Sequence, residues 1–167
     1  SGSAGTVLRT GDGGATWQPM NIPGAEKLDF RDIDAVSEQV AYVRSIGSGE
    51  SSRIYKTIDG GVTFLPITNG LNQPASGRVL EVEIDRTHPQ TLYGSTSAQG
   101  LFKSNDGGAS WAPLPGPVSN CQGIAIDPTD GQIVYASSWS GLVYVSVDGG
   151  ATWHDLGPSI VGGECLV

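Results

Sequence analysis

Two glutamates, Glu81 and Glu83, have a spacing that suggests chemistry. They stand two positions apart in an apolar stretch that predicts a β-strand, so their side chains project from the same face of it. Two carboxylates at a suitable separation can serve as the acid and the base of glycoside hydrolysis, and carboxylate oxygens also bind cations. Asp32 aligns with Glu83 in an earlier, similar stretch and is a third candidate. The alternative is that these carboxylates only line a water-filled space.

Residues that could bind a ligand also stand in stretches that predict loops. They are polar or aromatic and differ from one stretch to the next: Arg44, Glu50, Arg53, Asn69, Asn72, Gln73 and Trp139. An exposed tryptophan beside polar groups is typical of surfaces on which sugar rings stack, although Trp139 could instead pack against its own loop. His88 and His154 have no serine or cysteine partner in a nucleophile motif.

The elements that position these residues are set by an internal repeat. One eight-residue pattern occurs four times at near-constant spacing, in residues 10–17, 57–64, 104–111 and 146–153. Its Asp-Gly-Gly core predicts a hairpin turn in which the carboxylate accepts backbone N–H groups. Each pattern closes on a large aromatic residue, which we expect to be buried against the neighbouring repeat. The aspartates and closing aromatics are Asp12 and Trp17, Asp59 and Phe64, Asp106 and Trp111, and Asp148 and Trp153.

Short strands joined by turns are the secondary structure that the composition favours. With 25 glycines, 10 prolines and only 16% charged residues, the chain does not suit a helical bundle. Alternating and apolar runs predict four strands in each repeat. The first strands are expected at 29–35, 79–85 and 122–127, the second at 40–45, 91–96 and 133–138, the third at 6–10, 53–58, 100–105 and 142–147, and the fourth at 15–19, 62–67, 109–114 and 151–156.

The repeated pattern Ser/Thr-x-Asp-x-Gly-x-Thr-Trp resembles the Asp-box, or BNR repeat, of sialidases, sortilin-type receptors, xyloglucanases and photosystem II assembly-factor-like proteins. The stretches 30–36, 41–43 and 53–57 are most similar to the bacterial assembly-factor-like proteins. The resemblance implies an all-β propeller of four-stranded antiparallel blades, with about four blades' worth of sequence here. It places each box on the outer rim, between the third and fourth strands of a blade. Phe64 departs from the tryptophan of the pattern.

The same resemblance places the candidate residues. First strands line the central channel of a propeller, so Glu81, Glu83 and Asp32 would form an acidic channel site. The loop candidates, Trp139 above all, would share the face around the channel mouth, where propellers usually bind ligands. We therefore expect a non-catalytic binding or scaffold propeller, of the assembly-factor kind, whose partner is a protein or a glycan. The alternative is a glycoside hydrolase or a fragment of one. The Arg-Ile-Pro signature of sialidases is absent, and xyloglucanases use two complete propellers.

Residues that recur at one position of the repeat are interpreted as architectural. Tyr42, Tyr93 and Tyr135 recur in the second strands, and we align Asp34, Asp85 and Asp127 at the ends of the first strands.

Charge and cysteine content exclude some classes of partner. A net charge of −8 argues against nucleic acid and anionic membranes, and no stretch is apolar enough to insert into a bilayer. Cys121 and Cys165 lack a C-x-x-C spacing, so neither a zinc site nor any other cofactor is indicated. Each begins a first strand, where the Cα atoms would be too far apart for a disulfide, so we expect two buried free thiols. We expect an extracellular or periplasmic location rather than a cytoplasmic one.

The repeat divides the chain unevenly. Residues 1–20 match part of a blade, 28–67, 78–114 and 121–156 match whole blades, and 163–167 match the start of another. The broken blade would expose apolar side chains, namely Val7, Leu8, Leu166 and Val167. Either the chain is part of a longer propeller whose other blades cover these edges, or two copies pair into a ring of about eight blades.

Overall fold

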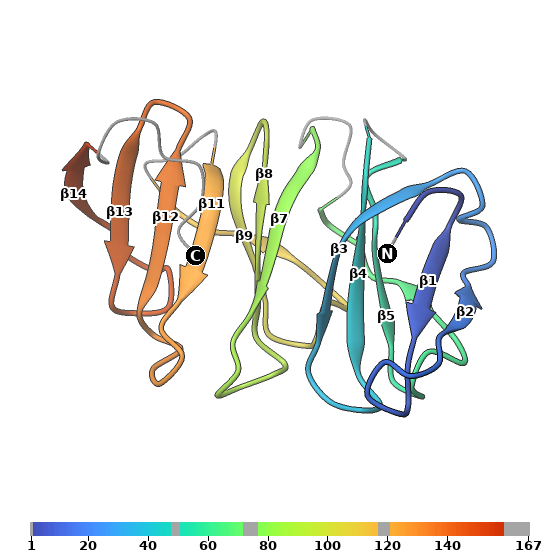
Figure 1. Ribbon diagram of the computed structural model, residues 1–167. Coiled ribbons are helices and arrows are strands. Elements are labelled where there is room, and N and C mark those ends of the chain that lie inside the picture. The colour runs from blue at the N-terminus through green and yellow to red at the C-terminus, as the bar shows by residue number, and fades with distance from the viewer. Residues whose placement is uncertain (1, 48–50, 72–76, 117–120, 159–167) are drawn as a thin grey trace. The chain divides into compact units, whose positions relative to one another are not determined.

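The protein is an all-β chain in the residues that its computed structural model describes, which are 2–47, 51–71, 77–116 and 121–158 (Figure 1). These residues contain fourteen strands and no α-helix, and therefore no helix that could cross a membrane. The strands are β1 (Thr6–Arg9), β2 (Gln18–Asn21), β3 (Asp29–Ala35), β4 (Ala41–Ile46), β5 (Ile54–Thr57), β6 (Leu65–Pro66), β7 (Val79–Ile84), β8 (Leu92–Thr96), β9 (Gly100–Ser104), β10 (Ala112–Pro113), β11 (Cys121–Ile126), β12 (Val134–Ser138), β13 (Leu142–Ser146) and β14 (His154–Pro158).

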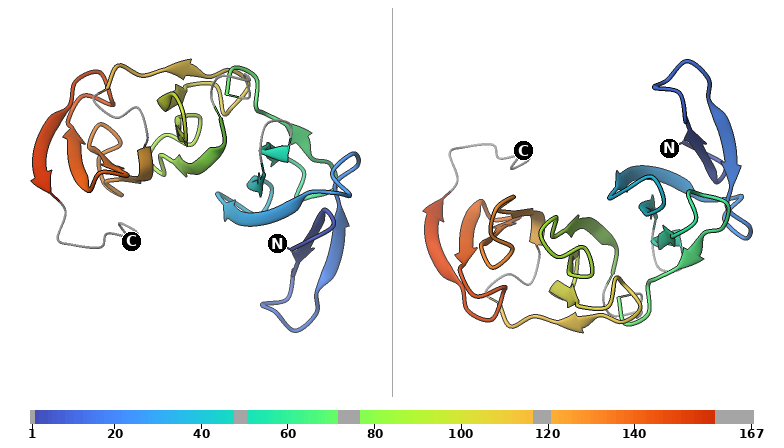
Figure 2. Two further views of the ribbon diagram at one scale, coloured as in Figure 1. Left: turned by 90° about the horizontal axis from the view of Figure 1, so that it is seen from above. Right: turned by 90° about the horizontal axis from the view of Figure 1, so that it is seen from below.

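Consecutive strands pair with one another. β1 and β2 form a hairpin, and β3–β6, β7–β10 and β11–β14 form three four-stranded sheets, all antiparallel. The prediction of four-stranded antiparallel blades is therefore confirmed. The chain divides into two compact units, residues 1–67 and 68–167. The first holds the hairpin beside the β3–β6 sheet, and the second holds the other two sheets (Figure 2).

Each Asp-box is held by the same set of hydrogen bonds. In the fourth box the Asp148 carboxylate accepts the Thr152 N–H at 2.8 Å and the Thr152 hydroxyl at 2.5 Å. The Ser146 hydroxyl donates to Asp148 and accepts the Gly150 N–H, both at 2.8 Å. Gly149 and Gly150 have φ of 68° and 93°, which suit glycine. The bonds from Thr152, followed by the one from Ser146, lower the pKa of Asp148 from 3.8 to about 2.

The closing aromatic residues of the boxes differ in burial. Phe64 and Trp111 are 8% and 7% exposed, and Trp153 is half-buried. Trp17 is 57% exposed, so the expectation that every box aromatic is buried is wrong for the first box. Phe64 lies in a core cluster with Ile22, from the segment that precedes its blade. Among the described residues, no comparable segment covers the ring of Trp17.

Register between first and second strands corrects one alignment made from the sequence. Tyr42 pairs with Asp34, and Tyr93 at the equivalent position pairs with Glu83. Asp34 is therefore equivalent to Glu83 and not, as aligned above, to Asp85. The place of Asp85 is taken in the first complete blade by Val36, whose N–H bonds across the turn as that of Asp85 does.

The same register corrects the position of Asp32. Asp32 pairs with Arg44, which stands two positions after Tyr42. Glu81 pairs with Ser95, which stands two positions after Tyr93, so Asp32 is equivalent to Glu81 and not to Glu83. Acidic residues at every second position make a slip of two residues invisible in the sequence, because it leaves each side chain on the same face.

A β-bulge also stands at this point in every first strand. The register shifts between Phe30 and Asp32, between Val79 and Glu81, and between Cys121 and Gly123.

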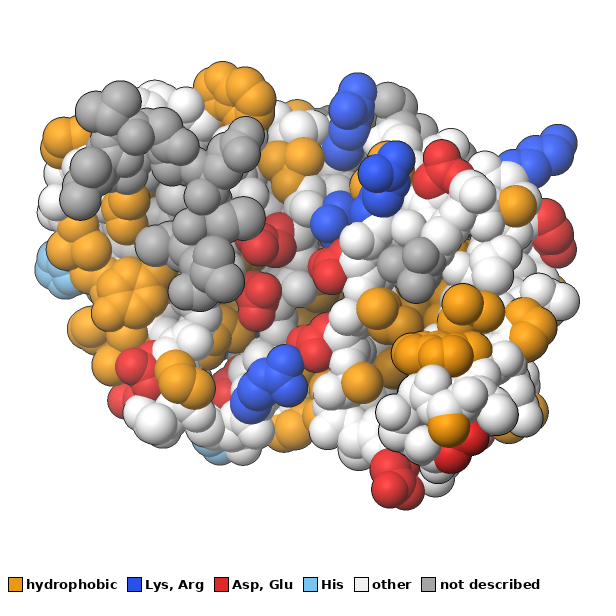
Figure 3. All heavy atoms as spheres, in the orientation of Figure 1, with side chains coloured by type: hydrophobic (Ala, Val, Ile, Leu, Met, Phe, Trp, Pro, Cys, Tyr) orange, Lys and Arg blue, Asp and Glu red, His pale blue; other side chains and the backbone are white. Residues whose placement is uncertain are grey.

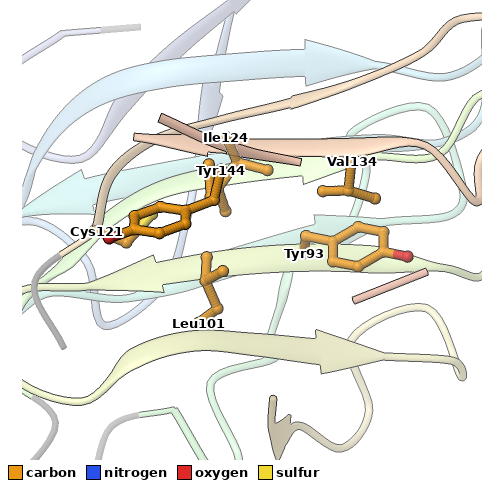
Figure 4. Packing of buried hydrophobic residues seen from close by; sticks show 7 residues of the cluster. Tyr93, Leu101, Cys121, Ile124, Val134 and Tyr144 are labelled. Atoms are coloured by element: carbon orange, nitrogen blue, oxygen red, sulfur yellow. The ribbon is translucent and has the colours of Figure 1, made fainter. Parts of the chain in front are cut away.

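The core of each unit lies between its sheets. In the second unit, buried side chains of β8 and β9 pack against those of β11, β12 and β13 (Figure 4). These residues are Tyr93, Leu101, Cys121, Ile124, Val134, Ala136 and Tyr144. In the first unit the hairpin and the following segment pack against the β3–β6 sheet, through Val7, Ile22, Ala25, Phe30, Val43, Tyr55 and Phe64. Val7 is 2% exposed, so its predicted exposure is wrong, whereas Leu8 is 47% exposed as predicted.

We predict that acid weakens the fold through the boxes. A folded-state pKa of about 2 for Asp148, below its usual 3.8, means that ionised Asp148 stabilises the fold above about pH 4. This contribution is lost as the pH falls toward 2. Urea midpoints measured from pH 5 to pH 2 should therefore fall less steeply in Asp148→Asn, which also starts from a lower midpoint. The control Asp29→Asn removes an exposed carboxylate outside the boxes, and an equal flattening there would contradict the prediction.

Candidate functional site

Glu81 links two neighbouring blades. Its carboxylate Oε2 accepts the backbone N–H of Ile124 at 2.6 Å, and Ile124 lies on β11, the first strand of the next blade. Gly123 stands beside it, and a Cβ added there would lie 3.6 Å from the same Oε2 and 2.9 Å from the Ser137 hydroxyl. One of the three candidate catalytic carboxylates therefore holds a backbone donor at the junction of β7 and β11.

The other two carboxylates have different surroundings. Glu83 is half-buried on β7, at the position that pairs with Tyr93. Asp32 lies on β3 in the first unit, where its carboxylate is 3.6 Å from Nε of Arg44 and its side chain is 43% exposed. Figure 3 shows acidic side chains over β3 in the first unit and over β7 in the second. The structure thus brings Glu81 and Glu83 together on one strand, as the sequence predicted. It places the Asp32 carboxylate beside the Arg44 guanidinium.

Cys121 is fully buried at the start of β11 and is a free thiol. Burial and the nearby charge of Glu81 raise the pKa of this thiol to about 12. A thiol in that state is a poor nucleophile at neutral pH, since the thiolate is the reactive form. The expectation for Cys121 is confirmed, whereas Cys165 lies outside the described residues.

The predicted loop candidates are only partly described. Trp139 is 72% exposed, in the turn between β12 and β13 that the Gly141 N–H closes on the Ser138 carbonyl. Arg44 and Arg53 are half-buried on either side of the β4–β5 loop, where the Arg53 N–H donates to the Ser45 hydroxyl at 2.9 Å. Asn69 is exposed in a turn before β7. Glu50, Asn72 and Gln73 lie outside the described residues.

One recurring contact was missed in the sequence. Lys103, one residue before its box, donates from Nζ to the carbonyl of Gly149 in the next box at 2.9 Å. The Tyr93 hydroxyl donates to the same carbonyl at 3.1 Å. Arg9 is equivalent to Lys103 and donates to the carbonyl of Gly60 at 2.6 Å. The signal was available, because a basic residue precedes the box in three of the four repeats.

A groove of about 580 Å³ opens in the first unit, between the β1–β2 hairpin and the β3–β6 sheet. Its apolar lining comes from both sides and includes Leu8, Trp17, Met20, Ile33 and Phe64. Leu8, Trp17 and Ile33 are 47%, 57% and 41% exposed. Sequence reasoning did not foresee this groove, which we call the hairpin groove.

Metal ligands do not converge anywhere in the described part of the chain. No group of three or more His, Cys, Asp or Glu side chains is arranged to hold an ion there. Among the described residues, Glu81 and Glu83 on β7 therefore have no third His, Cys, Asp or Glu side chain placed to bind an ion with them.

The four-stranded antiparallel sheets are those of a β-propeller. Residues 144–155, which include the fourth box, match the BNR/Asp-box repeat family. A comparison with curated proteins finds no match to the chain.

Solved propellers share the fold. YCF48 bound to D1 peptide is 18% identical with a TM-score of 0.63, over 96% of this chain and 49% of that one. YCF48 from Cyanidioschyzon merolae is 19% identical with a TM-score of 0.63, over 95% of this chain and 52% of that one. An ancestral GH74 enzyme is 23% identical with a TM-score of 0.61, over 78% of this chain and 18% of that one. The chain thus spans about half the length of the YCF48 chains and less of the GH74 enzyme.

We predict that Glu81 contributes to stability through its hydrogen bond. Glu81→Ala leaves the Ile124 N–H without its acceptor and should destabilise the protein by about 1–3 kcal/mol. Glu81→Gln keeps a carbonyl oxygen that can accept the same bond and should lose less. Urea denaturation followed by circular dichroism measures both, and equal losses in the two variants would contradict the assigned role.

We predict that the Cys121 thiol is protected by the fold. In a Cys165→Ser background, Cys121 should react with a disulfide reagent such as DTNB only as fast as the protein opens. Its rate should rise to that of a free thiol in denaturant. Reaction at the free-thiol rate without denaturant would refute this burial.

Proposed function

We propose that this protein is a non-catalytic binding propeller whose partner is a polypeptide. The observation that carries the proposal is the bond from the Ile124 N–H to the Glu81 carboxylate. A general acid must present its proton to the substrate, and a nucleophile must present a free oxygen. Glu81 instead holds its oxygen against the backbone of the neighbouring strand, which supports an architectural role for the carboxylate pair.

The binding surface in this proposal is the loop face around Trp139. A large aromatic side chain that is 72% exposed on a rigid hairpin can serve as an anchor, because its burial by a partner removes much apolar area from water. In the first unit, the equivalent loop carries the cationic side chains of Arg44 and Arg53. A polypeptide partner is supported by the similar propeller described as YCF48 bound to D1 peptide.

We predict that Trp139 dominates the binding energy. A random peptide library displayed on phage and selected on the purified protein should yield binders whose affinity falls about tenfold or more in Trp139→Ala. The matched control is Val147→Ala, which shortens an exposed apolar side chain in the fourth box. Selected peptides that bind Trp139→Ala as tightly as the unaltered protein would disprove the role of this face.

A glycoside hydrolase is the second candidate, because Glu81 and Glu83 share one face of β7 and a similar propeller is a GH74 enzyme. Release of reducing sugar from xyloglucan and from bacterial glycans tests it. The binding proposal expects no turnover above a heat-inactivated sample. Turnover that is lost in folded Glu81→Gln or Glu83→Gln would overturn the proposal.

A further inference from the structure

We propose that Asn69 is a site of spontaneous covalent modification, at which the side-chain amide leaves as ammonia and the residue becomes aspartate or isoaspartate. The site lies in the turn of residues 68–71 in the second unit, which we call the Asn69 turn, and it is independent of the binding proposal. Asn69 and Gly70 form the one Asn-Gly pair in the sequence. Glycine hinders this reaction least, because it carries no Cβ beside the attacking nitrogen.

Both reacting groups of this pair are unbonded in the part of the chain that the structure describes. Asn69 is exposed, and neither its side-chain amide nor the Gly70 N–H takes part in a hydrogen bond there. The bond that closes the turn runs from the Leu71 N–H to the Thr68 carbonyl at 3.0 Å, so it uses neither group. The two groups can therefore react without first breaking an interaction of the fold.

A box turn contains a similar pair in protected form. In the third box Asp106 precedes Gly107, whose N–H donates to the Gln90 carbonyl at 2.8 Å. The Asp106 carboxylate accepts the Ser110 hydroxyl at 2.6 Å and the Ser110 N–H at 2.9 Å, and these bonds lower its pKa to about 2. An ionised carboxylate resists attack by nitrogen, and a bonded N–H is withheld from reaction. The fold thus protects this Asp-Gly pair and leaves the pair in the Asn69 turn accessible.

Packing requires glycine at position 70. Gly70 has a φ of 94°, and a Cβ added there would lie 2.7 Å from the carbonyl oxygen of Trp111. A side chain would therefore strain the turn and collide with a neighbouring backbone. The glycine that makes Asn69 reactive is thus fixed by the way the turn fits against the segment between β9 and β10.

The reaction needs only water and hydroxide from the solvent. The Gly70 nitrogen gives its proton to hydroxide and attacks Cγ of Asn69. The bond from Cγ to the amide nitrogen breaks, and that nitrogen takes a proton from water and leaves as ammonia. One water then opens the cyclic imide at either of its two carbonyls. One opening gives aspartate, and the other gives isoaspartate, whose main chain runs through the side-chain carbon. No atom is oxidised or reduced.

Isoaspartate disturbs the packing of Leu71. Its extra main-chain carbon lies inside the turn that ends at Leu71, a residue that is 0% exposed. Leu71 and the Trp111 ring both lie against Gly94 on β8, where an added Cβ would be 3.5 Å from Leu71 Cδ1 and 3.2 Å from the ring. A longer turn displaces Leu71 from this place, whereas aspartate leaves the main chain unchanged. The isoaspartate form is therefore the less stable product.

Peptide mapping by mass spectrometry, on the full chain kept in mildly alkaline buffer, tests the site. Asn69 should be converted at least about fivefold faster than the exposed Asn105, because the N–H that follows Asn105 is held by the Ser104 hydroxyl at 3.3 Å and must be released first. An isoaspartyl methyltransferase should label the peptide that contains Asn69. Asn69→Gln should abolish this label, since its side chain must close a larger ring. Conversion of Asn69 no faster than that of Asn105 would overturn the proposal.

Urea denaturation tests the effect on the fold. Ion exchange isolates the converted chains by their additional negative charge, and Asn69→Asp supplies the same charge on an unaltered main chain. The converted chains should have a lower urea midpoint than Asn69→Asp, in proportion to the isoaspartate that methylation detects. Asn69→Gln kept in the same buffer controls for other damage and should retain its midpoint. Isoaspartate-containing chains as stable as Asn69→Asp would refute the displacement of Leu71.

Discussion

The structure depends on the hydrogen-bonded turn that each box aspartate closes. Asp148 and its three equivalents accept a backbone N–H and a hydroxyl from one residue four positions later, and this fixes the hairpin between the third and fourth strands. The turn forces two glycines into positive φ, and the carbonyl of the first is left for the preceding blade. The box is therefore a turn and also a contact point between blades.

That contact constrains where chemistry can occur. The two blades of the second unit are joined by the bond from Lys103 to the Gly149 carbonyl and by the bond from the Ile124 N–H to Glu81. A bulge in each first strand precedes the position of Glu81. The acidic side chain that most resembles a catalytic group is thereby used in packing. The proposed binding surface therefore lies on a loop, where the repeat does not fix the side chains.

The sequence predicted the strands and the boxes because both rest on local patterns. Alternation and Asp-Gly-Gly turns act over a few residues, and the first three strands of each blade follow them to within about one residue. Each fourth strand begins three residues later than predicted, because the box turn extends through its closing aromatic residue. The sequence alignment made Asp32 equivalent to Glu83, which is wrong, because acidic residues at alternate positions allow the alignment to slip by two residues. The exposure of Trp17 and the burial of Val7 were missed because burial depends on which segment lies next to each residue. The hairpin groove could not be predicted, as it depends on how the β1–β2 hairpin packs against the β3–β6 sheet.

The same contact between blades has different surroundings in the two units. In the second unit, the Tyr93 hydroxyl and Lys103 both donate to the Gly149 carbonyl, and Tyr93 is part of the core. In the first unit the same groups face a groove, already held in position by the bond from Arg9 to Gly60. The bond to the first glycine of the box therefore ties one blade to the next whether or not a tyrosine shares the acceptor.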